Sequence, residues 1–98
     1  MSYLLVEKAP GSTSAQSGGI FLSAGSSIVA SGLSGAETAA ILIHVNGGDF
    51  IAAKDSAGSA VSLTATVSQI TIGGAGTYAI GALGTTTANI KIVANQSL

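Results

Sequence analysis

The sequence predicts an all-β protein, an antiparallel β-sandwich of about seven or eight short strands that follows an extended N-terminal arm. Three observations predict this class. Short runs rich in Ile, Val and Thr recur at the spacing typical of a sandwich or barrel, an Asn-Gly-Gly turn joins two of them, and one later run alternates between apolar and hydroxyl residues. An Ig-like and a jelly-roll-like strand order both fit this pattern, and no segment is a convincing helix.

The most informative stretch is residues 37–55, in which Asn-Gly-Gly at 46–48 separates two apolar runs. This is the strongest short-range signal for a β-hairpin. Ser-Gly-Ala-Glu at 34–37 has the form of a helix capping box and offers a helical alternative. We prefer the hairpin, because β-branched residues favour strands and the glycines follow after too few residues for a stable helix.

The length of the hairpin loop decides which side chains face the core. With a loop of even length, Phe50 shares a face with Ile41 and Ile43, since successive side chains point to opposite sides of a strand. We therefore expect Phe50 at the centre of the core. Ile51 falls on the opposite face, beside His44.

The other predicted strands lie on both sides of this hairpin. They are residues 20–22, 28–30, 61–67, 70–72, 77–82 and 90–94. The alternation in residues 61–67 predicts a half-buried strand with one wet face. A Gly-rich turn at 73–76 joins two strands in a second predicted hairpin.

The first residues combine an apolar end with a linker. Tyr3-Leu4-Leu5-Val6 precedes a stretch rich in Gly, Ser and Thr, so we divide the chain into an arm and linker at 1–19 and a sandwich domain at 20–98. Such an arm could bind a neighbouring subunit. The alternative is a first strand followed by a surface loop.

Alternation also separates a predicted core from an outward apolar surface. The predicted core is Ile41, Ile43, Val45, Phe50, Leu63, Ile70, Ile72, Tyr78, Ile80, Ile90 and Ile92. The candidate interface combines the arm with residues expected on the opposite face: Tyr3, Leu4, Leu5, Val6, Leu42, His44, Ile51 and Val93. A contiguous patch of this kind marks an interface.

The composition points to assembly. The chain is 47% hydrophobic but only 7% charged, where an ordinary globular domain carries about 25% charged residues. A net charge of −1 gives little repulsion between copies. Three lysines are too few cations for a nucleic-acid footprint, and without cysteine there is no disulfide or thiolate site. We expect neither a Sec-type export signal nor a membrane span.

Motifs for chemistry are weak. The only histidine, His44, would face Asp49 in the tightest hairpin register, but a pair without a third group makes neither a metal site nor a triad. Gly-x-Gly-x-x-Ala at 74–79 is followed by a β-rich run instead of the helix that a dinucleotide site needs. The spacing of Glu37 and Asp55 around Asp49 matches no calcium loop. We expect no enzyme, metal or cofactor.

Residues 31–94 resemble the small β-sandwich proteins in the virions of tailed bacteriophages. The resemblance lies in the loop at 31–38, the turn at 46–50, the turn at 55–58 that leads to 61–64, and the hairpin at 70–78. It implies a structural virion component made in the host cytoplasm. One such role is a capsid decoration or cement protein, often a homotrimer, that binds the major capsid protein shell.

Two other functions stay open. The chain could be a structural module of the phage tail, baseplate or fibre, which sequence does not distinguish from a capsid protein. It could also be a carbohydrate- or receptor-binding module that uses the loops at 73–76 and 83–89, although four scattered aromatic residues are few for a sugar platform. An enzyme ranks last.

Overall fold

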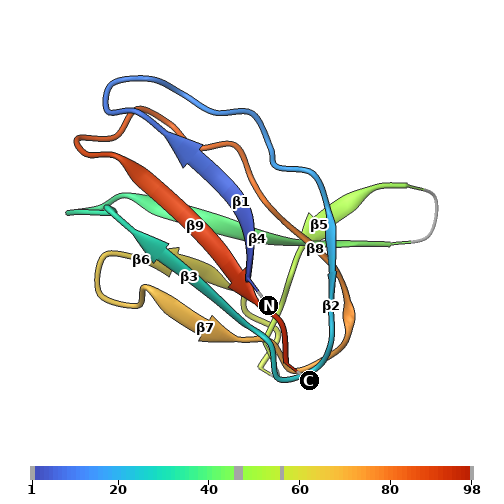
Figure 1. Ribbon diagram of the computed structural model, residues 1–98. Helices are drawn as coiled ribbons and strands as arrows, with labels where there is room; N and C mark the ends of the chain where they lie inside the picture. Colours follow the sequence, from blue (N-terminus) through green and yellow to red (C-terminus); the bar gives the residue numbers. More distant parts are fainter. Residues whose placement is uncertain (1, 46–47, 56, 98) are drawn as a thin grey trace.

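A computed structural model describes residues 2–45, 48–55 and 57–97. These residues form two packed antiparallel sheets without a helix, which confirms the all-β sandwich (Figure 1). The described part has nine strands, slightly more than predicted. They are β1 (Ser2–Lys8), β2 (Ile20–Leu22), β3 (Ser27–Ser31), β4 (Thr38–His44), β5 (Phe50–Ala52), β6 (Ser62–Thr64), β7 (Gln69–Thr71), β8 (Gly76–Ile80) and β9 (Ile90–Asn95).

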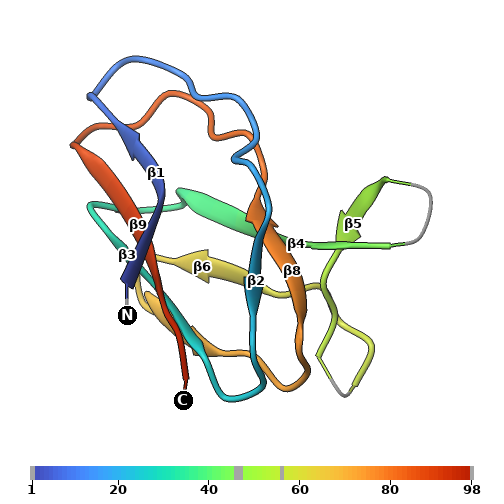
Figure 2. The same cartoon turned by 45° about the vertical axis from the view of Figure 1, so that its right-hand side comes forward.

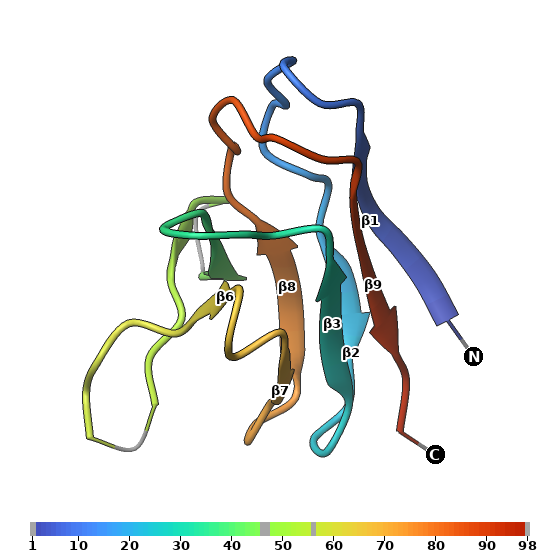
Figure 3. The ribbon, with the colours of Figure 1, turned by 90° about the vertical axis from the view of Figure 1, so that its left-hand side faces the viewer.

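The strands are divided between a first sheet, in the order β1-β9-β3-β7, and a second sheet, in the order β2-β8-β4-β5. β6 belongs to the second sheet, because it pairs with the first half of β4 while β5 pairs with the second half. Figure 3 shows β7 as the last strand of the first sheet, with the turn that follows β5 (yellow-green) beyond it. The chain changes sheet repeatedly, which ties the two layers together.

The segment predicted as an arm is the edge strand of the first sheet. β1 pairs with β9 from Ser2↔Asn95 to Lys8↔Ile90, with a bulge between Leu4 and Val6. The structure therefore has the alternative arrangement, a first strand followed by a loop. The reason is burial: Val6 packs in the core, and Lys8 is only 7% exposed.

The linker is also tied to the body of the sandwich. The Lys8 ammonium donates hydrogen bonds to Thr86 Oγ1 and to the Ala9 carbonyl. Gly11 N donates to Thr86 O at 2.9 Å, and Ser17 N donates to Ile80 O at 2.9 Å. Residues 9–19 consequently run along the sandwich as a bound loop.

The predicted hairpin is present, but its predicted register is wrong. β4 pairs with β5 so that His44 lies opposite Phe50 and Ile43 opposite Ile51, and Val45 N donates to Asp49 O at 2.8 Å. The turn residues Asn46 and Gly47 lie outside the described residues. An odd loop between Val45 and Asp49 inverts the expected faces. Phe50 thus shares the outward face of His44, and it is half-buried instead of central.

Ile51 lies on the other side of the hairpin, the side of Ile43, and not beside His44 as predicted. It is nevertheless 50% exposed. Figure 2 shows the reason: β5 and the end of β4 project beyond the rest of the sandwich. No strand of the described first sheet covers this part of the second sheet.

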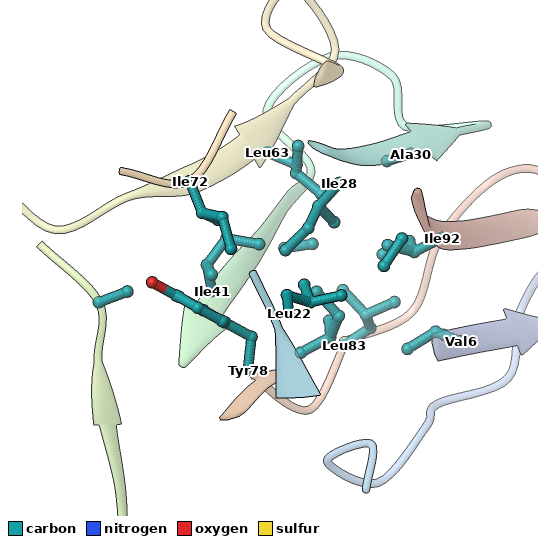
Figure 4. Close-up of a cluster of buried hydrophobic side chains, with 14 of the residues drawn as sticks. Val6, Leu22, Ile28, Ala30, Ile41, Leu63, Ile72, Tyr78, Leu83 and Ile92 are labelled. Carbon is teal, nitrogen blue, oxygen red and sulfur yellow. The ribbon is translucent and has the colours of Figure 1, made fainter. Parts of the chain in front are cut away.

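The core fills the space between the two sheets (Figure 4). Seven predicted core residues are buried: Ile41, Leu63, Ile72, Tyr78, Ile80, Ile90 and Ile92. Ile43, Val45, Ile70 and Phe50 are only half-buried. The prediction missed a second group of buried residues, Val6, Leu22, Ile28, Ala30, Ala39, Leu83 and Ala94, most of which come from the first sheet and its neighbours.

The second predicted hairpin, at 70–78, is wrong. β7 pairs with β3 in the first sheet, whereas β8 pairs with β2 and β4 in the second. Ile72 N donates to Ser26 O at 2.9 Å, which continues the pairing of β7 with β3 to the end of the apolar run. The glycines that follow carry the chain across to the other sheet. This part of the resemblance to phage sandwiches therefore does not hold.

The Ser-Gly-Ala-Glu motif forms a turn and not a helix start, as we preferred. Glu37 Oε1 accepts a hydrogen bond from Ser34 N at 2.9 Å, and Glu37 N donates to Ser34 O at 3.1 Å. Glu37 Oε2 also accepts from Thr87 N at 3.1 Å. The carboxylate thus connects two loops, the one between β3 and β4 and the one between β8 and β9.

Candidate functional site

The predicted interface residues do not form one surface. Leu4 and Val93 lie opposite each other on the outer face of the first sheet. Leu42 and His44 lie on the outer face of the second sheet, and Ile51 lies on the inner side of β5. The remaining arm residues face inward or pack at the bulge: Tyr3 is paired with buried Ala94, Leu5 packs against the core, and Val6 belongs to it.

The outer face of the first sheet has a narrow apolar row. Leu4, Val93 and Val29 are neighbours in register across β1, β9 and β3. Leu4 is 52% exposed. One polar row flanks it on each side: Ser2, Asn95, Ser27 and Thr71 on one side, and Glu7, Lys91 and Ser31 on the other.

The outer face of the second sheet is broader and less polar. Phe21 lies opposite Thr77, His44 opposite Phe50, and Leu42 opposite both Ala79 and Ala52. We call this surface the aromatic face and define it as Phe21, Leu42, His44, Phe50, Thr77 and Ala79. It contains no lysine and no carboxylate, and His44 is its only titratable side chain.

Packing on the aromatic face depends on a glycine. A Cβ added at Gly19 would lie 2.6 Å from Thr77 Cγ2 and 2.8 Å from Phe50 Cζ, so the Phe50 ring reaches over the sheet to the Gly19 backbone. The His44 ring meets the Phe50 ring edge to face, with centroids 5.3 Å apart. Ala79 is completely buried although it points outward, which places it within this outer cluster.

Phe21 is the most exposed large apolar side chain of the aromatic face, at 61%. β2 is only three residues long, and Leu22, the next residue, fills the core instead. The sequence pattern predicted neither an exposed Phe21 nor a position for Phe50 on this surface. Alternation within so short a strand does not tell which side is buried, so no sequence signal distinguished Phe21 from Leu22.

The predicted contact of His44 with Asp49 is wrong. His44 lies opposite Phe50, and the Asp49 carbonyl accepts a hydrogen bond from Val45 N. Among the described residues no group of three His, Cys, Asp or Glu side chains could hold a metal ion. The second sheet therefore presents this histidine as part of an apolar surface and not as half of an acid-base pair.

A groove of about 550 Å³ opens into the core at the free edge of β7. Ile41, Val61 and Tyr78 line it from the second sheet, and Ile70 and Ile72 line it from the first. The Tyr78 hydroxyl donates to Gly74 O at 2.8 Å, and burial raises the pKa of this phenol. Asp55, at the rim, accepts hydrogen bonds from Ala57 N and Ser59 N, so its carboxylate stabilises its own turn.

Comparison of the chain with protein-family models, with curated proteins and with solved structures finds no match. In the part of the chain that the structure describes, no helix is long and apolar enough to cross a membrane.

Proposed function

We propose that this chain is a structural virion protein of a tailed bacteriophage, a capsid decoration protein that binds the major capsid protein shell through the aromatic face. Its role is to hold neighbouring capsid subunits together, without turnover of a substrate. The resemblance of residues 31–94 to phage sandwiches supports the virion setting, although its hairpin at 70–78 does not hold. The low charge of the chain supports a role as a subunit of a larger assembly.

The observation that carries the proposal is Phe21, 61% exposed on a sheet face without lysine or carboxylate. Interface centres are depleted in charged residues and enriched in aromatic ones. A partner that covers Phe21 removes apolar surface from water, which contributes about 25 cal/mol for each Å² buried. The half-buried Phe50 and Leu42 beside it extend the same surface.

The test uses virions of the phage that encodes the chain, with heads and tails separated and the chain quantified in each fraction. We expect the chain in many copies on heads. Purified protein should rebind to heads stripped of it, and Phe21→Ser should weaken this binding about tenfold or more. Leu4→Ser, which removes an apolar residue of similar exposure from the first sheet, is the matched control and should bind as the native chain does.

Other outcomes contradict the proposal. Presence on tails alone would make the chain a tail module, and absence from virions would overturn the virion role. Equal binding by the native chain and the Phe21→Ser variant would show that another surface makes the contact.

A further inference from the structure

We infer that Gln96 is the positioning residue of the aromatic face: its side-chain amide takes the place of a peptide group of a neighbouring strand, completes the outer edge of β2, and so holds Phe21 in position. That Phe21 is held for binding to a partner rests on the proposed function. That Gln96 holds Phe21 at all rests only on hydrogen bonds within the single chain.

The backbone of Phe21 points away from the rest of its sheet. Among the described strands, β2 is the last of the second sheet and pairs with β8 alone. In an antiparallel pair, the backbone groups of alternate residues point toward the partner strand, and those between them point away. The Phe21 carbonyl points to Gln96, which donates to it, so both backbone groups of Phe21 point away from β8. Pairing with β8 therefore does not fix this residue directly.

The Gln96 amide binds β2 as a peptide group would. Its Nε2 donates to Phe21 O at 2.9 Å, and its Oε1 accepts from Ser23 N at 2.6 Å. A residue of a parallel strand makes the same pair of bonds, to the carbonyl of one residue and to the N–H of the residue two positions later. Leu22, between the two, is fully buried in the core. One side chain thus stands in for one residue of an additional strand.

Gln96 is itself held by the first sheet. It follows Asn95, the last residue of β9, which pairs with Ser27 of β3. The hydroxyl of Ser26, which is buried, donates to Gln96 Oε1 at 3.1 Å and accepts from Ser97 N at 2.8 Å. The amide oxygen faces donors and the amide nitrogen faces a carbonyl, so the amide fits only one way round. It therefore connects the first sheet to the outer edge of the second.

A fixed Phe21 matters for binding. β2 is only three residues long, and the Phe21 side chain is 61% exposed, so packing does little to hold it. Ordering a mobile segment on association costs free energy and weakens binding. Gln96 orders this segment when the chain folds, and it does so without belonging to the aromatic face.

The first experiment measures the effect of Gln96 on β2 by NMR of the full chain in solution. Gln96→Leu keeps a side chain of similar size and removes both polar groups. Protection of the Ser23 amide from hydrogen exchange should fall about tenfold, as expected for the loss of one or two hydrogen bonds. The backbone order parameter of Phe21 should fall from about 0.85 to about 0.6 or less. The Ile41 amide, which donates to Val61 O within the second sheet, should stay protected and shows that the fold is intact.

Gln96→Glu separates positioning from packing. The carboxylate can still accept from Ser23 N, but it places an oxygen where Nε2 donated to Phe21 O. We expect a protected Ser23 amide and a mobile Phe21 at neutral pH. As the pH falls below the ordinary glutamate pKa of 4.5, the protonated carboxyl gains an O–H donor, and the order parameter of Phe21 should recover. Gln16→Glu, at an exposed position, is the matched control and should leave Phe21 ordered at both pH values.

The second experiment measures binding to heads stripped of the chain. Gln96→Leu should weaken binding about tenfold, and it should add nothing when Phe21 is already replaced by Ser, because the two residues act through one contact. An ordered Phe21 in Gln96→Leu, or a Gln96→Glu variant without recovery in acid, would overturn the inference. So would unchanged binding by a variant whose Phe21 is mobile. If the native chain does not bind heads, the proposed function fails, and the NMR measurements still decide whether Gln96 positions Phe21.

Discussion

The outer faces of the two sheets come from strands with similar alternation, yet they expose different chemistry. On the first sheet, the row of Leu4, Val93 and Val29 is one side chain wide and lies between polar rows. On the second sheet, Phe50 reaches over the strands to Gly19, and apolar residues occupy adjacent rows. The number of apolar residues in a strand thus matters less for an exposed patch than the residues on neighbouring strands.

This difference has a consequence for binding. A single apolar row between hydroxyl and charged side chains stays hydrated on both flanks, so covering it with a partner also removes water from polar groups. None of the six residues that define the aromatic face is a lysine, an arginine or a carboxylate. A partner that covers this face gains apolar burial with a smaller desolvation cost.

The largest expected effect is the loss of a core side chain, and the cost of a change on an outer face is compared with it. Ile92 and Val93 are neighbours on β9, but Ile92 is fully buried whereas Val93 points outward. Ile92→Ala should lower the free energy of unfolding by about 2–5 kcal/mol, because it leaves a cavity between the sheets. Val93→Ala should cost less than about 1 kcal/mol. Urea denaturation of both variants measures the difference, and equal losses would mean that the outer row is also packed.

The second prediction tests the packing of Phe50 and Thr77 against Gly19 on the aromatic face. Gly19→Val forces its side chain against Thr77 and the Phe50 ring, and such overpacking costs about 1–3 kcal/mol. Gly18→Val is the matched control, because an added Cβ there meets no atom within 4 Å, and it should change stability by no more than about 0.5 kcal/mol. Thermal denaturation compares the pair. Equal stability of the two variants would show that Phe50 does not rest on Gly19.

The sequence was sufficient for the class of fold and for part of the core. Ile41, Ile80 and Ile92 lie in runs whose β-branched residues and alternation specify a strand and its buried side. The turn chemistry likewise located the hairpin between β4 and β5. These features are local, so a single segment carries enough information to predict them.

The errors concern relations between segments. Asn-Gly-Gly marks a turn, but whether Val45 pairs with Asp49 depends on the whole sheet, and one residue of slip moved Phe50 from the core to the surface. The pairing of β1 with β9 joins residues at opposite ends of the chain. The aromatic face joins Phe21 to Phe50 through two other strands. Only the order of strands in the sheet reveals such neighbours.

The third prediction compares the two outer faces directly. Phe21 and Leu4 have similar exposed fractions, 61% and 52%. Replacement of either by Ser should change stability by no more than about 0.5 kcal/mol. Retention on a hydrophobic interaction column should nevertheless fall more for Phe21→Ser than for Leu4→Ser, because Phe21 belongs to the broader patch. Equal decreases would mean that the neighbouring residues do not distinguish the faces.

The smallest effect concerns the connection between the sheets at Glu37. Its carboxylate is exposed, and hydrogen bonds from Ser34 N and Thr87 N, the former the larger cause, lower the pKa of Glu37 below its ordinary value of 4.5. A lowered folded-state pKa means that the ionised form is favoured by folding. This stabilisation is complete above pH 4.5 and is lost as the pH falls through the lowered pKa of Glu37.

We therefore expect Glu37→Gln to be less stable than the native chain at neutral pH, since the amide cannot accept hydrogen bonds at both of its positions. The difference in urea midpoint should be modest for an exposed group, and it should disappear as the pH is lowered below 4.5. Glu7→Gln controls for the change in net charge. A midpoint difference that persists unchanged in acid would mean that Glu37 acts through packing and not through its charge. In that case the loops between the sheets would be held by contacts that do not titrate, and the two outer faces would keep their relative orientation at low pH.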